Sequence, residues 1–80
     1  MSSRPHAPHA SLSPDRSSAV GERVRQARHA AQLTQEGLAQ AADLGTTHLQ
    51  RIERGVANPT LATLYALGDA LRVHPRDFLP

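Results

Sequence analysis

The sequence predicts an all-α fold: one compact domain of five short helices that follows a disordered N-terminal arm. From residue 18 onward, apolar residues recur at intervals of three and four, as on the buried face of a helix. No stretch alternates apolar and polar residues as a half-buried strand would. Gly, Pro, Ser, Thr and Asn separate the periodic stretches, so short turns join short helices, which pack around a shared core.

The predicted arm is residues 1–17, and the domain occupies 18–80. The arm contains three prolines, and Leu12 is its only large aliphatic residue after Met1. Such a segment buries too little apolar surface to offset the entropy lost on ordering. Its two histidines have no third ligand and no scaffold, so we expect no metal site there.

Capping residues and apolar spacing set the helix boundaries. The predicted helices span 19–31, 35–42, 46–54 and 60–71, and Pro75 opens a short fifth helix. Ser18 and Thr34 are the expected N-caps of the first two. Before the fourth helix, either Asn58 caps with Pro59 as the first helical residue, or Thr60 caps. The residues expected to face inward are Val20, Val24, Ala27, Ala31, Leu38, Ala39, Ala42, Leu44, Leu49, Ile52, Leu61, Leu64, Leu67, Leu71 and Phe78.

The second and third helices form a predicted helix-turn-helix pair. Ala39 is small enough to let two helices cross closely, and a turn of about three residues forces a steep crossing. Such a turn needs one residue with positive φ, usually Gly, and Asp43 occupies that place. Asp tolerates this backbone region because its short side chain bonds locally to the backbone.

The outward face of 46–54 carries hydrogen-bonding and cationic groups without an acid. An α-helix fits the major groove of DNA, where Arg grips guanine and a Thr methyl meets a thymine methyl. The residues expected to contact bases are Thr46, Thr47, Gln50 and Arg51. Phosphate contacts are expected from Arg54, from His48, and from Gly45 at the helix N-terminus, where free N–H groups bind anions. The competing interpretation is a plain solvated face of a small bundle.

Glu53 falls on the inner side of the third helix, where a carboxylate requires a cation. Arg28 on the first helix is the best candidate, so we expect a structural ion pair between them.

The composition excludes several classes of protein. Nine arginines against seven acids give a net charge of +2, which permits nucleic-acid binding without arguing for it. There is no cysteine, hence no disulfide and no thiolate metal site. No apolar run approaches the roughly 20 residues that span a membrane, and no signal peptide is visible, so we expect a cytoplasmic protein. No catalytic set of side chains appears, so we expect neither an enzyme nor a cofactor.

The motifs "LTQEGLA", "RIERG", "NPT" and "HPRDFL" together resemble the Cro/CI-type (xenobiotic-response-element) helix-turn-helix family, which has the lambda-repressor-like fold. The resemblance covers residues 20–79. It implies a DNA-binding protein that acts as a dimer on a two-fold symmetric operator.

The resemblance also implies roles for single residues. Gln35 lies where the family has a phosphate-contacting Gln, and Asn58 and Thr60 lie in a loop that approaches phosphate. The family's base-reading positions correspond to Thr46, Thr47 and Arg51, and its structural ion pair to Arg28 and Glu53. The departures from the family pattern are Gly37, Asp43, Gly45 and His74, which weaken helix ends without altering the fold.

Two functions from different classes fit these observations. The first is a transcriptional regulator of a bacterium or phage, a homodimer on double-stranded DNA, with Tyr65 and Leu79 at its dimer interface and Phe78 in the core. The second is an antitoxin-type module that neutralises a partner protein and autoregulates its operon, in which the arm folds on that partner.

Overall fold

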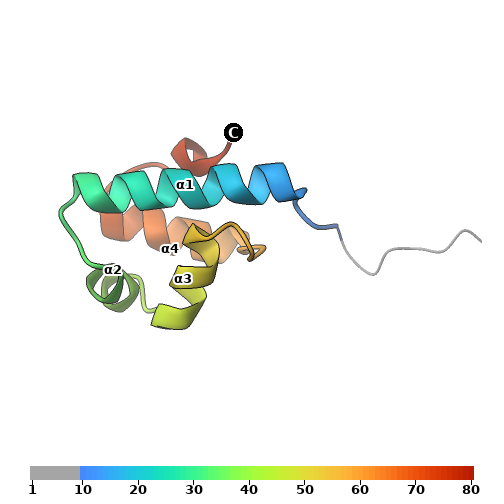
Figure 1. Cartoon of the computed structure of the whole chain (residues 1–80). Helices are drawn as coiled ribbons and strands as arrows, with labels where there is room; N and C mark the ends of the chain where they lie inside the picture. The colour runs from blue at the N-terminus through green and yellow to red at the C-terminus, as the bar shows by residue number, and fades with distance from the viewer. Residues whose placement is uncertain (1–9) are drawn as a thin grey trace, which may run out of the picture.

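The computed structural model describes residues 10–80. Within them the chain forms four α-helices and one 3-10 helix: α1 Pro14–Ala30, α2 Gln35–Ala41, α3 Thr46–Glu53, α4 Leu61–Leu71 and η1 Pro75–Phe78. α1 and α4 run in the same direction, with α2 and α3 on one side of them and η1 on the other (Figure 1). The all-α prediction is confirmed, but the fifth helix is a single 3-10 turn and not an α-helix.

All the helices contribute to the core, which contains the buried apolar residues Val20, Val24, Leu38, Ala39, Ala42, Leu49, Ile52, Leu64, Leu67, Leu71 and Phe78. Most residues predicted to face inward are therefore buried. Leu61 is an exception at 66% exposed, because it is the first residue of α4 and lies at the edge of the core. Ala31 is also exposed, because it follows the last residue of α1 as its C-cap.

The first helix begins earlier than predicted. α1 starts at Pro14 and not near residue 19, and its N-cap is Ser13, whose hydroxyl accepts from the Arg16 N–H at 3.3 Å. Proline is favoured in the first turn of a helix because its missing N–H has no intrahelical acceptor there. Residues 14–17 of the predicted arm are therefore helical, and Ser18 lies inside α1. The arm's residues 1–9, with both histidines, lie outside the described residues.

The predicted caps of the next helices hold. The Thr34 hydroxyl accepts from the Gly37 N–H at 2.9 Å at the start of α2. Between the two alternatives for α4, the cap is Thr60, whose hydroxyl accepts from the Thr63 N–H at 3.1 Å. α3 has Gly45 as its N-cap and therefore no side-chain cap. These local bonds fix the starts of α2 and α4 independently of the core.

All four α-helices end in the same pattern, with one residue of positive φ. Beyond α2, the Asp43 N–H donates to the Gln40 carbonyl and the Leu44 N–H donates to the Ala39 carbonyl at 2.8 Å. This is the Schellman motif, in which the last carbonyls of a helix find donors. The four residues of positive φ are Gln32 (59°), Asp43 (56°), Gly55 (77°) and Arg72 (59°). The prediction for Asp43 is confirmed, and two further helix ends use long side chains instead of glycine.

α1 packs closely across the end of α3. A Cβ added to Gly21 would lie 2.2 Å from the Ile52 carbonyl oxygen and 2.9 Å from that of Glu53. This close approach sets the distance between α1 and α3. Gly68 is also in close contact, with the chain after α4: a Cβ there would lie 2.7 Å from the Val73 carbonyl oxygen.

None of the helices in residues 10–80 is long and apolar enough to cross a membrane.

The turn between α2 and α3 yields a prediction about stability. Asp43→Gly leaves the free energy of unfolding unchanged or raises it, because Gly adopts positive φ without strain. Asp43→Val lowers it by about 1–2 kcal/mol, because a β-branched side chain is strained there. Urea denaturation measures both. Ala41→Val, on an exposed helical site, is the control for valine itself, and equal stabilities for the Gly and Val variants at position 43 would contradict the prediction.

Candidate nucleic-acid interface

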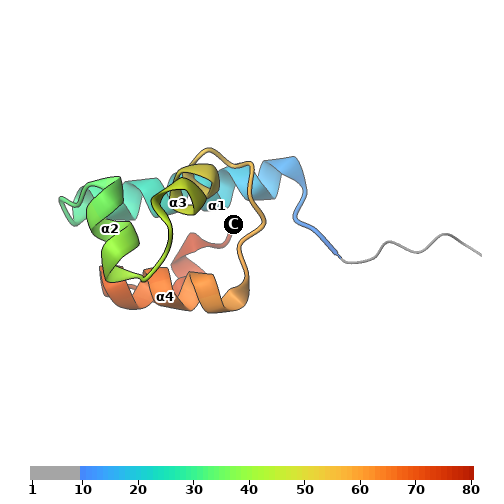
Figure 2. The same cartoon turned by 90° about the horizontal axis from the view of Figure 1, so that it is seen from below.

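α3 is held by its inner face and presents its outer face to solvent. Leu49, Ile52 and Glu53 are buried, whereas the residues between them are exposed. The exposed side chains are Thr47, His48, Gln50, Arg51 and Arg54, and Thr46 is half-buried. α2 and α3 share one side of the molecule, which faces the viewer in Figure 2. The residues predicted to contact bases therefore all lie on or beside the exposed face of one helix.

A buried ion pair ties this helix to α1, as predicted. Arg28 donates from Nε to Glu53 Oε2 at 2.7 Å and from Nη2 to Oε1 at 3.0 Å. The Arg28 side chain is 10% exposed and that of Glu53 2%. Such a two-point contact fixes the relative orientation of two side chains as well as their distance. Arg28 Nη1 also donates to the Leu33 carbonyl at 2.9 Å, which joins the α1–α2 connection to the same group.

Gln35, the predicted phosphate contact at the start of α2, joins this network. Its side-chain nitrogen donates to Glu53 Oε1 at 3.0 Å. One donor of its amide is therefore engaged inside the protein. Gln35 thus links α2 to α3, and only the remainder of its hydrogen-bonding capacity is open to a ligand.

A shallow hollow of about 430 Å³ lies between the starts of α2 and α3. The residues that line it are Arg28, Thr34, Gln35, Glu36, Thr46 and Gln50. The charge of Arg28 is balanced by Glu53, and Glu36 adds a carboxylate. The hollow therefore offers hydrogen-bonding groups and no excess of positive charge.

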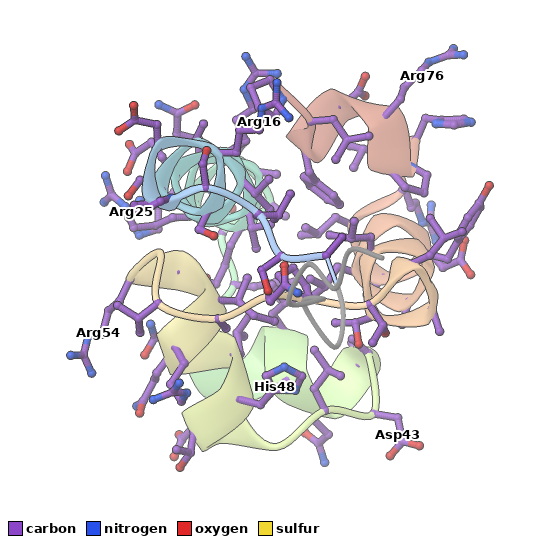
Figure 3. All side chains as sticks on the ribbon, turned by 90° about the vertical axis from the view of Figure 1, so that its right-hand side faces the viewer. Arg16, Arg25, Asp43, His48, Arg54 and Arg76 are labelled. Carbon is purple, nitrogen blue, oxygen red and sulfur yellow. The ribbon has the colours of Figure 1, made fainter. Side chains whose placement is uncertain are left out.

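Arg51 and Arg54 supply the cations of the α3 face. The Arg51 Nη2 donates to the Val56 carbonyl at 3.1 Å, which folds this side chain toward the loop after α3. Figure 3 shows Arg54 pointing outward from α3, with His48 on a different side of the same helix. Arg54 and His48 thus lie on different sides of α3, and His48 does not line the hollow.

The loop before α4 contains two predicted phosphate contacts that already have partners. The Asn58 side-chain oxygen accepts from the backbone N–H of Leu12 at 3.2 Å. The Thr60 hydroxyl caps α4 and also donates to the Thr63 hydroxyl at 3.0 Å. Thr60 therefore has its donor in use, whereas the amide nitrogen of Asn58 makes no hydrogen bond to the described residues.

A surface pair on α1 adds little net charge to this side. Arg25 donates to Glu22 at 2.7 and 2.9 Å, and both side chains are nearly half exposed. The hydrogen bond from Arg25 holds the pKa of the Glu22 carboxyl below its usual range. The two charges offset each other, and Arg25 contributes little to an attraction for phosphate.

Among residues 10–80, no group of three His, Cys, Asp or Glu side chains could hold a metal ion. The described residues bring together the exposed polar face of α3, the start of α2 and the loop before α4.

Residues 24–78 match the family described as helix-turn-helix. The chain belongs to the Cro/CI-type helix-turn-helix family. The resemblance noted from the sequence motifs is confirmed, and the family is one of DNA-binding regulators.

Relatives within this helix-turn-helix family are named for regulation. The immunity repressor protein of Bacillus phage phi105 is 43% identical over 54 residues, which are 68% of this chain and 38% of that protein. The control protein C.BamHI of Bacillus amyloliquefaciens is 40% identical over 60 residues, 74% of each chain. This chain thus spans well under half of the phage repressor and about three quarters of C.BamHI.

A solved structure supports the same helix-turn-helix fold. The restriction-modification controller protein C.AhdI from Aeromonas hydrophila superposes with a TM-score of 0.77 and 33% sequence identity. The superposition covers 79% of this chain and 96% of C.AhdI. Neither this structure nor the two relatives is named as an antitoxin, so the comparisons give that alternative no support.

Sequence reasoning missed several residues of this helix-turn-helix surface. Leu12 was assigned to the arm, but its side chain packs on the core and its N–H reaches the loop before α4. Val56 and Leu61 are large apolar residues that are 50% and 66% exposed. The apolar spacing of α4 predicted that Leu61 faces inward. Its exposure could have been predicted only if the edge of the core had been known.

The ion pair between α1 and α3 yields a second prediction. Arg28→Ala or Glu53→Ala lowers the free energy of unfolding by about 3–5 kcal/mol, because each leaves a buried charge without its partner. Arg28→Met combined with Glu53→Leu costs less than either alanine variant, because no charge is left behind. Denaturant unfolding followed by circular dichroism measures these differences. Glu22→Ala, which breaks only the exposed pair, is the control and changes stability little; additive losses would contradict this account.

Proposed function

We propose that this chain is a sequence-specific transcriptional regulator that binds double-stranded DNA as a homodimer on a two-fold symmetric operator. In this proposal α3 enters the major groove, with bases contacted by Thr46, Thr47, Gln50 and Arg51. Phosphates are contacted by Gln35, Gly45, His48, Arg54 and Asn58, and more weakly by Thr60, whose hydroxyl already caps α4. The observation that supports this most is the rigid presentation of α3: three inward residues hold it, and its exposed face has no acid.

The names of the relatives support regulation, since one is a phage immunity repressor and others are control proteins. The charge pattern supports readout through hydrogen bonds more than attraction to phosphate. Net charge is only +2, and the hollow beside α3 contains Glu36. Each phosphate that a cationic side chain neutralises releases counterions, which makes affinity fall more steeply as salt concentration rises. A chain with few cationic contacts is therefore expected to show a shallow salt dependence. One copy of the chain then binds DNA weakly, and a second copy is required for useful affinity.

The dimer interface in this proposal involves exposed apolar residues. Tyr65 and Leu79 are 49% and 45% exposed, and Leu61 lies one turn before Tyr65 on α4. Exposed large apolar side chains one turn apart on a helix, such as Leu61 and Tyr65, are suited to a protein–protein contact. Leu61 joins the two interface residues predicted from the sequence.

Selection of binding sites from random DNA tests the proposed function. Two identical half-sites in inverted orientation, with centres about one helical turn of DNA apart, are expected. Recovery of no enriched sequence at low salt would rule out sequence-specific binding.

Arg51→Ala tests the assignment of base contacts. On the selected operator this variant loses about 1–3 kcal/mol of binding free energy and relaxes the preference at one position of each half-site. Titration by fluorescence anisotropy against the operator and against single-base variants measures both. Arg76→Ala is the matched control, because Figure 3 shows Arg76 on η1 at the corner of the molecule opposite α3. An unchanged base preference in the Arg51 variant would remove Arg51 from the base contacts.

Tyr65→Glu tests the interface. A charge placed among exposed apolar side chains opposes their association, so the variant is expected to be monomeric at concentrations where the unaltered chain is dimeric. Sedimentation equilibrium gives the mass, and circular dichroism verifies that the helices persist. Asp69→Glu, one turn later on an exposed site of α4, is the control that leaves association unchanged. A dimer of undiminished stability for Tyr65→Glu would place the interface elsewhere.

A further inference from the structure

Leu12 connects the start of the described chain to the loop before α4. Its backbone N–H donates to the Asn58 side-chain oxygen at 3.2 Å, across 46 positions of sequence. Its side chain packs against the core, and the next residue, Ser13, caps α1. Figures 1 and 2 both show the segment leading into α1 beside the loop that leads into α4. The Leu12 N–H is therefore held in place by contacts on either side of it.

This hydrogen bond fixes which way the Asn58 amide faces. A backbone N–H can only donate, so the oxygen of the amide, and not its nitrogen, must point to Leu12. The nitrogen, with two hydrogens, then points the other way. Within residues 10–80 it donates to no acceptor, and Asn58 is exposed. The result is an outward hydrogen-bond donor in a fixed orientation without a protein partner.

The same loop is braced from α3 as well. Arg51 donates to the Val56 carbonyl, and the Val56 N–H donates to the Arg51 carbonyl at 3.1 Å. Asn58 thus lies between a contact to α3 and a contact to the segment before α1. Residues 55–60 contain no cation. A donor in this loop can gain affinity for an anion through orientation, since ordering it on binding costs little entropy.

We propose that the backbone N–H of Leu12 is a positioning group that orients the Asn58 amide to donate to a DNA phosphate oxygen. The inference rests on the proposed function and adds to it a residue outside the helix-turn-helix that controls a phosphate contact. Hydrogen bonds to phosphate from neutral side chains set the register of a protein on DNA without reading sequence. Leu12 acts through its main chain, so removal of its N–H has an effect that a side-chain change does not reproduce.

The test uses the full chain and its selected operator, in which each phosphate of one half-site is replaced in turn by an uncharged methylphosphonate. At one particular phosphate, the methylphosphonate is expected to lower the affinity of the unaltered chain about tenfold more than it lowers the affinity of Asn58→Ala, because only the unaltered chain loses a hydrogen bond to a charged oxygen there. Leu12→Pro removes the N–H donor, and it is expected to lose the dependence on that same phosphate. Ser11→Pro, which leaves the Leu12 N–H intact, is the matched control and keeps the dependence.

A double variant separates positioning from a general loss of structure. Leu12→Pro combined with Asn58→Ala binds no more weakly than Asn58→Ala alone if Leu12 acts through Asn58. Asn58→Asp serves as a second variant if Leu12→Pro does not fold: its carboxylate still accepts from Leu12 but cannot donate to phosphate, so the dependence disappears in a folded protein.

Two results overturn the inference while leaving the proposed function in place: a retained dependence on the phosphate in a folded Leu12→Pro, and additive losses in the double variant. A retained dependence in Asn58→Asp overturns the inference and also removes Asn58 from the proposed phosphate contacts. Absence of sequence-specific binding by the unaltered chain overturns the proposed function instead, and the inference with it.

Discussion

The buried contact between Arg28 and Glu53 fixes how α3 is held. Both charges lie in a largely dry environment, where either one alone would be costly, and the two-point contact satisfies them only in one relative orientation of α1 and α3. Leu33 and Gln35 form hydrogen bonds to Arg28 and Glu53, so this ion pair also positions the α1–α2 connection and the start of α2. The polar network therefore specifies geometry that the apolar core, which is tolerant of small rotations, specifies less well.

Tight turns at the ends of the helices allow a short chain to reverse direction and pack its helices together. Every α-helix in residues 10–80 ends in a single residue of positive φ, and three of those four residues are not glycine. A left-handed residue with a side chain costs about 1–2 kcal/mol, and the Schellman hydrogen bonds offset part of that cost by satisfying helix carbonyls. At Gly55, by contrast, an added Cβ would meet Ser18 of α1 at 2.8 Å, so this end requires glycine for space as well as for its backbone.

The parts that the sequence predicts well are those with a local signal. Helical spacing identified the buried faces of α3 and α4, capping residues located α2, and the projection of α3 put Glu53 opposite Arg28. The misses are an overlooked local signal at Pro14 and positions whose state the local sequence does not show. Pro14 resembles a residue of a disordered arm until its role in the first turn of a helix is considered, Gln32 and Arg72 give no sign of positive φ, and no local pattern links Leu12 to Asn58. For the site, sequence reasoning placed residues on the exposed face of α3, but it could not show that Gln35 and Thr60 are already engaged within the protein.

The length of α3 has a consequence for how much DNA sequence one copy can distinguish. Its eight residues extend roughly 12 Å at about 1.5 Å per residue, which matches about four base pairs at ~3.4 Å each. A specific word of four base pairs occurs by chance about once in 250 positions, whereas a genome offers about 10⁶ or more competing sites. Two symmetric copies read about eight base pairs and reduce chance matches to roughly one in 65,000. In the proposed homodimer, the second copy therefore adds information content, independently of the affinity that it adds.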